Sequence, residues 1–306
     1  MDVRHLELLR ELSERGSVTA VARATYRTPS AVSQQLQTAQ REFGAQLVEP
    51  AGRGLRLTGA GELLARRAAD VATVLADVQA EWDAYRDEPS GTVSVMALPS
   101  AGEYLLPRAL VALEGTGIRV ECHDADVAEA DWAGLAKDHD LVIGHSLRER
   151  PPPGTEGLLV TRIVREPLDI ALPAGHRLAG HGPLQPAELV AAPWIGVPLG
   201  FPFDSVLRAI EDRTGASLDV RQWVRDNRLV EALVAAGCGL GVLPRFTTRP
   251  RDDLVLAPLA GVETGRHIMA IQRPDRARRI AVQRTLAAIR DVAAELPGAA
   301  TGDLAE

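Results

Sequence analysis

The chain has 306 residues, 46% hydrophobic and 25% charged, a composition typical of a globular protein with about two domains. No apolar stretch approaches the roughly 20 residues that span a bilayer, which excludes a membrane protein. We expect no secretory signal peptide, because the charged residues Asp2, Arg4 and Glu7 lie where the apolar segment of a signal peptide would be. The two cysteines exclude a disulfide framework and indicate a reducing, cytoplasmic compartment.

The net charge of −7 disfavours nucleic-acid binding only when it is averaged over the whole chain. Residues 1–58 hold eight arginines and six acidic residues, so this part has a net charge of +2 and the remainder carries −9. Contact with phosphate is local, and a small DNA-contacting domain on an acidic body is compatible with this distribution.

The first 58 residues predict a winged helix-turn-helix. Helices are expected at 2–14, 18–24 and 29–43, each with a capping residue at or just before its start, and the last also has proline at its first position. After a glycine pair, leucine alternates with arginine up to residue 57, which predicts a short β-wing.

The third predicted helix has an apolar face with Val32, Leu36 and Ala39, and a polar face rich in serine and glutamine. Such side chains donate and accept hydrogen bonds at base edges, and glutamine can pair bidentately with adenine. A polar face that is merely solvated is the alternative, but the helices, the cap and the wing together favour DNA binding. The candidate DNA-contacting residues are Thr28, Pro29, Ser30, Ser33, Gln34, Gln37, Arg53 and Arg56.

Thr58 caps a long helix that is predicted to run to about Asp87. Its apolar positions alternate in steps of four and three residues, the spacing of a coiled-coil seam. We expect this seam to pair with its copy in a second subunit; a helix that lies on its own core is the alternative. The seam runs through Ala68 to Tyr85, and its candidate dimerisation residues are Leu64, Val71, Leu75, Val78 and Trp82.

From residue 92 onward, strands alternate with helices, which predicts an α/β body with largely parallel sheets. Helices are expected at 226–236 and 277–295. The expected strands are 93–97, 118–122, 141–144, 168–172, 194–197, 240–243 and 268–272.

Metal, cofactor and enzyme signatures are not found. Cys122, His123 and Asp124 are adjacent, but alternation along a strand puts His123 on the opposite face, and no second pair has zinc spacing. No nucleophile elbow, phosphate-binding loop or dinucleotide fingerprint occurs between a strand and a helix. We therefore expect no metal, no cofactor and no catalysis.

Three segments resemble the LysR-type transcriptional regulators and occur in the order of that family. The first reads TPSAVSQQL at 28–36, followed by EFG at 42–44 and GRGLRLT at 52–58. The second reads LDIALPAGHRLA at 168–179, and the third reads LVAAGCGLGVLP at 233–244.

The resemblance implies an α+β protein that regulates transcription by binding specific double-stranded DNA. It would comprise a winged helix-turn-helix at 1–58, a linker helix at 59–89, and a two-lobed α/β effector-binding domain at 92–306, folded like a periplasmic solute-binding protein. Lobe I would span about 92–162 and 268–306, and lobe II about 163–267. The resemblance also implies a homodimer, commonly a homotetramer. The alternative is a solute-binding module or enzyme on the same fold, whose N-terminal helices serve only for oligomerisation.

The effector would bind in the cleft between the lobes. Ligands of open α/β sheets lie beyond the carboxyl ends of strands, and a helix N-terminus there suits an anion. The titratable imidazole of a histidine and an apolar wall would favour a small organic acid with an aromatic or apolar part. A plain helix cap, a surface histidine and core phenylalanines are the alternatives. The candidate effector-binding residues are Ser100, Ala101, His145, Phe201, Phe203 and Asp226.

Overall fold

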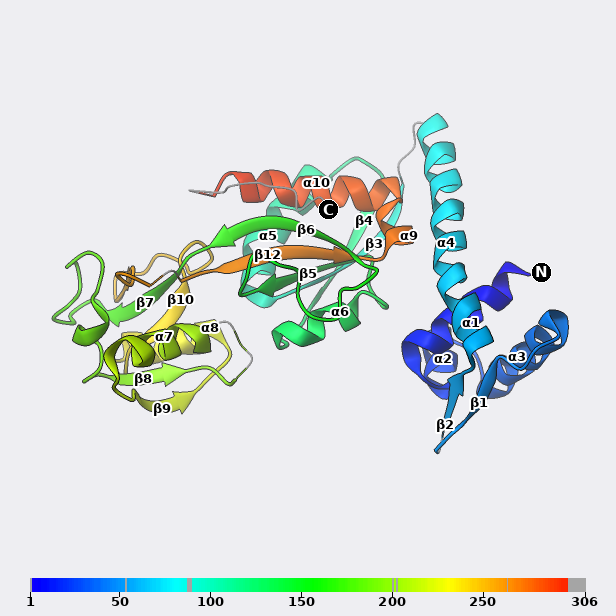
Figure 1. The fold of residues 1–306 in the computed structure, drawn as a ribbon. Coiled ribbons are helices and arrows are strands. Elements are labelled where there is room, and N and C mark those ends of the chain that lie inside the picture. Colours follow the sequence, from blue (N-terminus) through cyan, green and yellow to red (C-terminus); the bar gives the residue numbers. More distant parts are fainter. Residues whose placement is uncertain are drawn as a thin grey trace. The chain divides into compact units, whose positions relative to one another are not determined.

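The computed structural model describes residues 2–52, 54–86, 90–199, 201, 203–262 and 264–296. The chain divides into two compact units, which can be followed by colour in Figure 1. The first unit contains residues 1–89 with 273–283, and the second contains residues 90–272 with 284–306. No helix among the described residues is long and apolar enough to cross a membrane.

The first unit is a winged helix-turn-helix followed by a long helix, as the sequence predicts. Each of its long helices begins at a predicted cap: Thr28 Oγ1 accepts from the amide of Ala31 at 3.2 Å, and Thr58 Oγ1 from that of Gly61 at 3.2 Å. The elements are α1 (Val3–Arg15), α2 (Val18–Ala24), α3 (Pro29–Phe43), β1 (Val48–Ala51), β2 (Gly54–Leu57) and α4 (Gly59–Tyr85).

A small core joins these elements. Leu9 of α1, Val32 of α3 and Leu47 before β1 are fully buried, and Ala65 of α4 closes the cluster. Gly61 allows α4 to approach so closely, because a Cβ at this position would lie 2.2 Å from the carbonyl oxygen of Leu47. The start of α4 is therefore part of the helix-turn-helix core.

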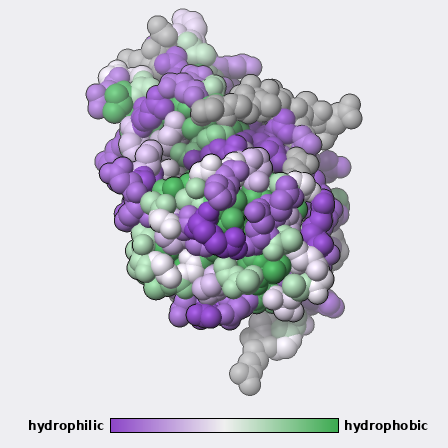
Figure 2. Space-filling model, turned by 90° about the vertical axis from the view of Figure 1, so that its left-hand side faces the viewer, coloured by the Kyte–Doolittle hydropathy of each residue, from purple (hydrophilic) through white to green (hydrophobic). Residues whose placement is uncertain are grey.

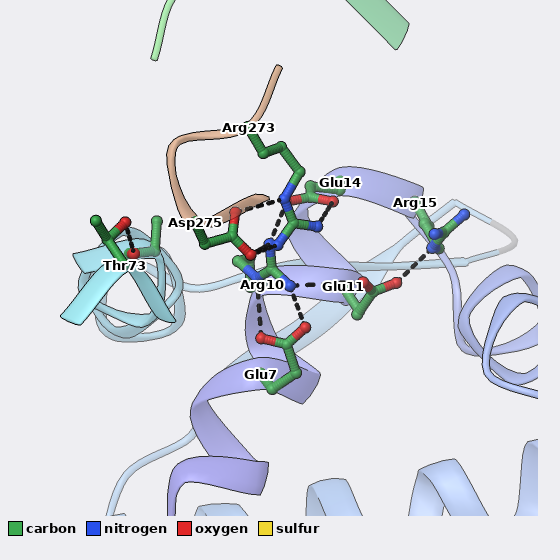
Figure 3. A network of polar contacts seen from close by, with 9 residues as sticks. Glu7, Arg10, Glu11, Glu14, Arg15, Thr73, Arg273 and Asp275 are labelled. Atoms are coloured by element: carbon green, nitrogen blue, oxygen red, sulfur yellow. Dashed lines mark hydrogen bonds and ion pairs between the residues drawn. The ribbon is translucent and has the colours of Figure 1, made fainter. Parts of the chain in front are cut away.

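The first unit also includes the segment that follows residue 272, and a network of charged side chains holds it there (Figure 3). Helix α9 (Pro274–Ala277) packs against α4. Arg10 of α1 is 7% exposed and lies 3.6 Å from Glu14 and 3.9 Å from Asp275. Arg273 donates to Asp275 at 2.7 Å. Burial raises the pKa of Glu14, and both arginines lie within 4 Å of its carboxylate.

One sheet of the second unit has the strand order β4-β3-β5-β12-β6. Strand β3 is parallel to β4 and β5, whereas β12 is antiparallel to β5 and β6. Its strands are β3 (Gly91–Ala97), β4 (Ile118–Asp124), β5 (Leu141–Ser146), β6 (Leu159–Glu166) and β12 (Arg266–Gln272). The helical segments along this part of the chain are α5 (Pro99–Ala112), η1 (Glu129–Asp131), α6 (Trp132–Leu135) and α10 (Ile280–Ala294).

The remaining strands of the second unit form two small sheets, ordered β10-β7-β11 and β8-β9, around a core that contains Leu168 and Trp194. Among these pairs only β8 and β9 are parallel. The elements are β7 (Leu168–Pro173), η2 (Pro186–Glu188), β8 (Pro193–Gly196), α7 (Asp204–Thr214), β9 (Asp219–Trp223), α8 (Asn227–Ala235), β10 (Gly241–Pro244) and β11 (Leu254–Ala257).

The prediction of largely parallel sheets is wrong. The chain leaves the first sheet along β6 and returns along β12, and these two strands pair with opposite directions. Such a pair needs no crossover helix between its strands, so the alternation of strands and helices does not reveal it. Strands β6, β9 and β11 were also not predicted. The helix expected at 277–295 corresponds to α10, which begins three residues later, and the short helix α9 before it was not predicted.

Candidate nucleic-acid interface and ligand pocket

Helix α3 presents an open polar face. Thr28, Pro29, Ser30, Gln34 and Gln37 are exposed and Ser33 is half-buried. Because Gln34 and Gln37 are three residues apart, their side chains are neighbours on the helix surface. No hydrogen bond to another described residue occupies either side chain. Both amides are therefore available to an external partner.

The other glutamines of α3 have structural contacts. Gln35 donates from Nε2 to the carbonyl oxygen of Arg4 at 2.8 Å and accepts from Arg27 at 2.5 Å. Gln40 accepts from the amide of Leu47 at 2.9 Å through Oε1. The structure thus separates glutamines that hold the unit together from those that face outward.

The wing contributes an exposed arginine. Arg56 on β2 donates to Glu49 on β1 at 2.6 Å, and its side chain is 71% exposed. Exposed ion pairs of this kind contribute about 0–1 kcal/mol, so Arg56 can exchange its partner for a phosphate at little cost. Arg53 lies outside the described residues, and its role stays a prediction.

The apolar seam of α4 changes its environment along the helix. Leu64 is half-buried against the helix-turn-helix core, and Val71 is also half-buried. Farther along, Leu75, Val78, Trp82 and Tyr85 are 51%, 60%, 54% and 82% exposed. The rings of Trp82 and Tyr85 stack with centroids 5.7 Å apart. The second half of the seam therefore forms an apolar strip that no other described residue of its own unit covers.

Figure 2 shows the face around α7, β8 and β9. Hydrophobic side chains are distributed differently on this face than on the strip of α4. Hydrophilic side chains cover much of this face and separate small hydrophobic areas. Scattered apolar residues are normal on soluble proteins, whereas a continuous exposed strip marks an interaction site.

A pocket of about 550 Å³ lies within the second unit. Of the candidate effector-binding residues, only Ala101 does not line it; that side chain is buried beneath the start of α5. The pocket thus brings together the carboxyl ends of β3, β4 and β5 with loops of the smaller sheets. The candidates that line it are Ser100, His145, Phe201, Phe203 and Asp226.

A buried ion pair meets the pocket through Arg266, which is one of the lining residues. Arg266 is 3% exposed and donates from Nε and Nη2 to Oε2 of Glu166 at 3.0 and 2.7 Å. The other oxygen of Glu166 accepts from the amides of Phe246 and Thr247 at 3.0 and 2.8 Å. These bonds saturate the carboxylate, which is what a buried charge requires.

Arg266 also reaches the first turn of α5. Its Nη2 donates to Oγ of Ser100 at 2.8 Å, and its guanidinium carbon lies 5.7 Å from the centroid of the Phe203 ring. Sequence reasoning missed Arg266 and Glu166, which lie 100 residues apart. The sequence does place a charged residue at one end of each strand. It gives no indication that these two charged residues pair with each other.

His145 is buried and neutral. Its Nδ1 accepts from Nε1 of Trp132 at 3.2 Å, so the ring proton must be on Nε2. Burial and the nearby charge of Arg266 lower the pKa of His145 to about 3. The expectation of a titratable imidazole is therefore wrong near neutral pH. Nε2 is buried with no partner among the described residues, and so is Oγ1 of Thr248, which also lines the pocket.

Acidic residues stand around the rest of the pocket. Glu103 pairs with Arg228 at 2.7 Å, and Asp226 caps α8 by accepting from the amide of Leu229 at 3.1 Å. Burial raises the pKa of Asp126, and Arg225 only partly opposes that effect. The ionisable residues that line the pocket, apart from His145, are Glu103, Asp124, Asp126, Asp226, Glu231, Arg225, Arg228 and Arg266.

Sequence comparisons agree with this architecture. A family model for the LysR substrate binding domain matches residues 86–294, and one for bacterial regulatory helix-turn-helix proteins of the lysR family matches residues 3–62. An uncharacterized HTH-type transcriptional regulator of Mycobacterium tuberculosis is 27% identical over 268 residues, 84% of each chain. The DNA-binding transcriptional dual regulator OxyR of Escherichia coli is 27% identical over 286 residues, 90% of each chain.

Solved structures share the fold. A full-length variant of OxyR from Pseudomonas aeruginosa matches with a TM-score of 0.67 at 16% sequence identity, over 100% of this chain and 98% of that chain.

Proposed function

The chain belongs to the LysR family of DNA-binding transcription regulators with an effector-binding domain, and on that premise we propose which residues carry each role. The single observation that supports DNA reading most directly is the open polar face of α3, which stands on a capped helix with Gln34 and Gln37 unoccupied. We propose that this helix enters the major groove.

The proposed contacts fall into two kinds. Ser30, Ser33, Gln34 and Gln37 would read base edges, because their side chains donate and accept. Thr28, Ser33 and the helix N-terminus would also suit phosphate, Pro29 would touch a thymine methyl group, and Arg53 and Arg56 would contact phosphate or a narrow minor groove.

The test is operator binding by single variants of α3. Ser33→Ala and Gln34→Ala should each weaken binding to the specific duplex by about 1–3 kcal/mol and change non-specific binding much less. Gln222→Ala, on an exposed position of β9, is the matched control and should bind like the wild type. Equal loss on specific and unrelated duplexes would show that α3 does not read sequence.

We propose that the pocket of the second unit binds the effector, a small molecule with an acidic group. The support is the convergence of Ser100, His145 and Thr248 as polar groups in a concave, partly apolar site. We keep residues 92–306 as the effector-binding domain, with a first lobe of about 92–162 and 268–306 and a second of about 163–267. Binding regulates only if the effector prefers one conformation of the regulator.

We propose that the protein acts in the cytoplasm as a homodimer or homotetramer joined through α4. The exposed strip of Leu75, Val78 and Trp82 supports this, because water would otherwise solvate it. Leu64 and Val71 would continue the same seam toward the helix-turn-helix.

We propose that the pocket binds rather than catalyses, in keeping with relatives that are named as regulators. Oγ of Ser100 accepts from an arginine, which cannot serve as a base, and His145 uses Nδ1 as an acceptor for Trp132. Nucleophilic catalysis would need a base within hydrogen-bond reach of the nucleophile.

A further inference from the structure

We infer that the effector is a small zwitterion, with a carboxylate that binds beside Ser100 and His145 and an ammonium group that binds beside Asp124 and Asp126. The inference rests on the proposed effector role of the pocket and specifies which ligand class that pocket selects.

The carboxylate end follows from unused donors. Oγ of Ser100 accepts from Arg266, so its own proton remains to be donated. Nε2 of His145 carries a proton, is buried and has no hydrogen-bond partner among the described residues. The hydroxyl oxygen Oγ1 of Thr248 is also buried and also has no such partner. An unmade buried hydrogen bond is costly, so an acceptor atom supplied by the ligand would stabilise these groups.

The acceptor group should carry a negative charge. Ser100 lies in the first turn of α5, a helix of 14 residues whose first amides have no partner within the helix. Such a terminus carries a partial positive charge and favours anions. The full charge of Arg266 is already balanced by Glu166, so the site suits one carboxylate rather than a doubly charged group.

The acidic residues in the rest of the pocket lining favour a ligand that also carries a positive charge. Glu103 is paired with Arg228 and Arg249, whereas the carboxylates of Asp124 and Asp126 have no ion pair or hydrogen bond among the described residues. The pocket wall holds five carboxylates and three arginines, which would repel a ligand that is only anionic. Burial raises the pKa of Asp126, and Arg225 and Arg266 oppose that effect only in part, so a ligand cation beside this carboxylate would favour its charged form.

An apolar wall completes the site. Val197, Phe201 and Phe203 line the same pocket, whose volume of about 550 Å³ suits a small organic molecule. Arg225 lies over the ring of Phe201 at 5.7 Å, which places that cation against the aromatic wall. An apolar side chain on the zwitterion would find its contacts here.

The experiment compares matched ligands on the full-length protein by calorimetry. L-Phenylalanine carries both charges, 3-phenylpropanoate has only the carboxylate, and phenethylamine has only the ammonium group. We expect L-phenylalanine to bind about tenfold more tightly than either single-charge analogue, because each charge has its own partner in the pocket.

Variants separate the two ends. Asp126→Asn should weaken L-phenylalanine about tenfold and leave 3-phenylpropanoate unweakened. Ser100→Ala should weaken both carboxylates and leave phenethylamine unchanged. Asp219→Asn, an exposed site on β9 outside the pocket, should change none of the three. Asp126→Asn removes a charge and keeps the size of the side chain, so the variant should fold, which a melting curve of each protein verifies.

Two results would overturn the inference. One is that 3-phenylpropanoate binds as tightly as L-phenylalanine and is insensitive to Asp126→Asn, which would retain the effector pocket but not the zwitterion. The other is that none of the three ligands binds at about 10 mM, a concentration that detects even millimolar affinity. Failure of the DNA-binding proposal would instead appear as absent operator recognition, whatever the ligand.

Discussion

The polar face of α3 and the pocket of the second unit are built in different ways. The α3 face comes from one stretch, residues 28–37, in which the exposed side chains of Gln34 and Gln37 have no hydrogen bond to another described residue. The pocket takes its groups from segments between Leu98 and Arg266, and those groups also bond one another. Changes on α3 should therefore alter one function, whereas changes in the pocket should alter stability as well.

The largest effect is expected at the buried ion pair. Arg266→Met leaves the charge of Glu166 buried without its arginine, which should cost about 3–5 kcal/mol of unfolding free energy. Arg119→Met is the matched control, since Arg119 forms an exposed pair with Glu121 and should cost about 0–1 kcal/mol. Urea unfolding measures both, and equal losses would mean that burial of the pair has no consequence.

The linker helix should show the next effect. Leu75→Asp with Val78→Asp places charge on the exposed strip, and burying it in a dimer should weaken association about a hundredfold, with operator binding lost in parallel. Val111→Asp, an equally exposed apolar site on α5, should leave association unchanged. Analytical ultracentrifugation decides; a double variant that stays dimeric at wild-type affinity would place the dimer contact elsewhere.

The third effect concerns pH and is smaller when it is counted for each pH unit. The pKa of His145 is about 3 in the folded chain and near 6.5 when unfolded, so the unfolded chain binds the extra proton between these values. Stability should fall as pH falls from 6.5 toward 3, with this residue adding up to about 1.4 kcal/mol per pH unit. His145→Gln should flatten the profile, and His123→Gln, an exposed site, should not. Parallel profiles for all three proteins would contradict the neutral buried imidazole.

The smallest effect is expected on the wing. Arg56→Ala should reduce the salt dependence of DNA binding by about one counterion and weaken all duplexes alike, because phosphate carries no sequence information. Arg119→Ala, on the second unit, should keep the wild-type slope. An unchanged slope for Arg56→Ala would mean that the arginine stays with Glu49 when DNA binds.

The sequence alone determined the first unit almost completely. Thr28 with Pro29 marks the start of α3, Thr58 marks the start of α4, and the helix period separates Val32 and Leu36 from Gln34 and Gln37. These features depend on residues within about four positions of one another, and helix caps and helix faces follow rules of that range.

Tertiary structure alone decided the character of the pocket. The sequence placed three candidate residues at the ends of strands and helices and so predicted a shared site; they are Ser100, His145 and Phe203. It did not predict the pairing of Arg266 with Glu166 or the neutral state of His145. The antiparallel return of β12 brings Arg266 to Glu166 and Ser100, and desolvation then sets which groups stay charged. Both depend on contacts between residues about 100 or more positions apart, for which a local pattern carries no signal.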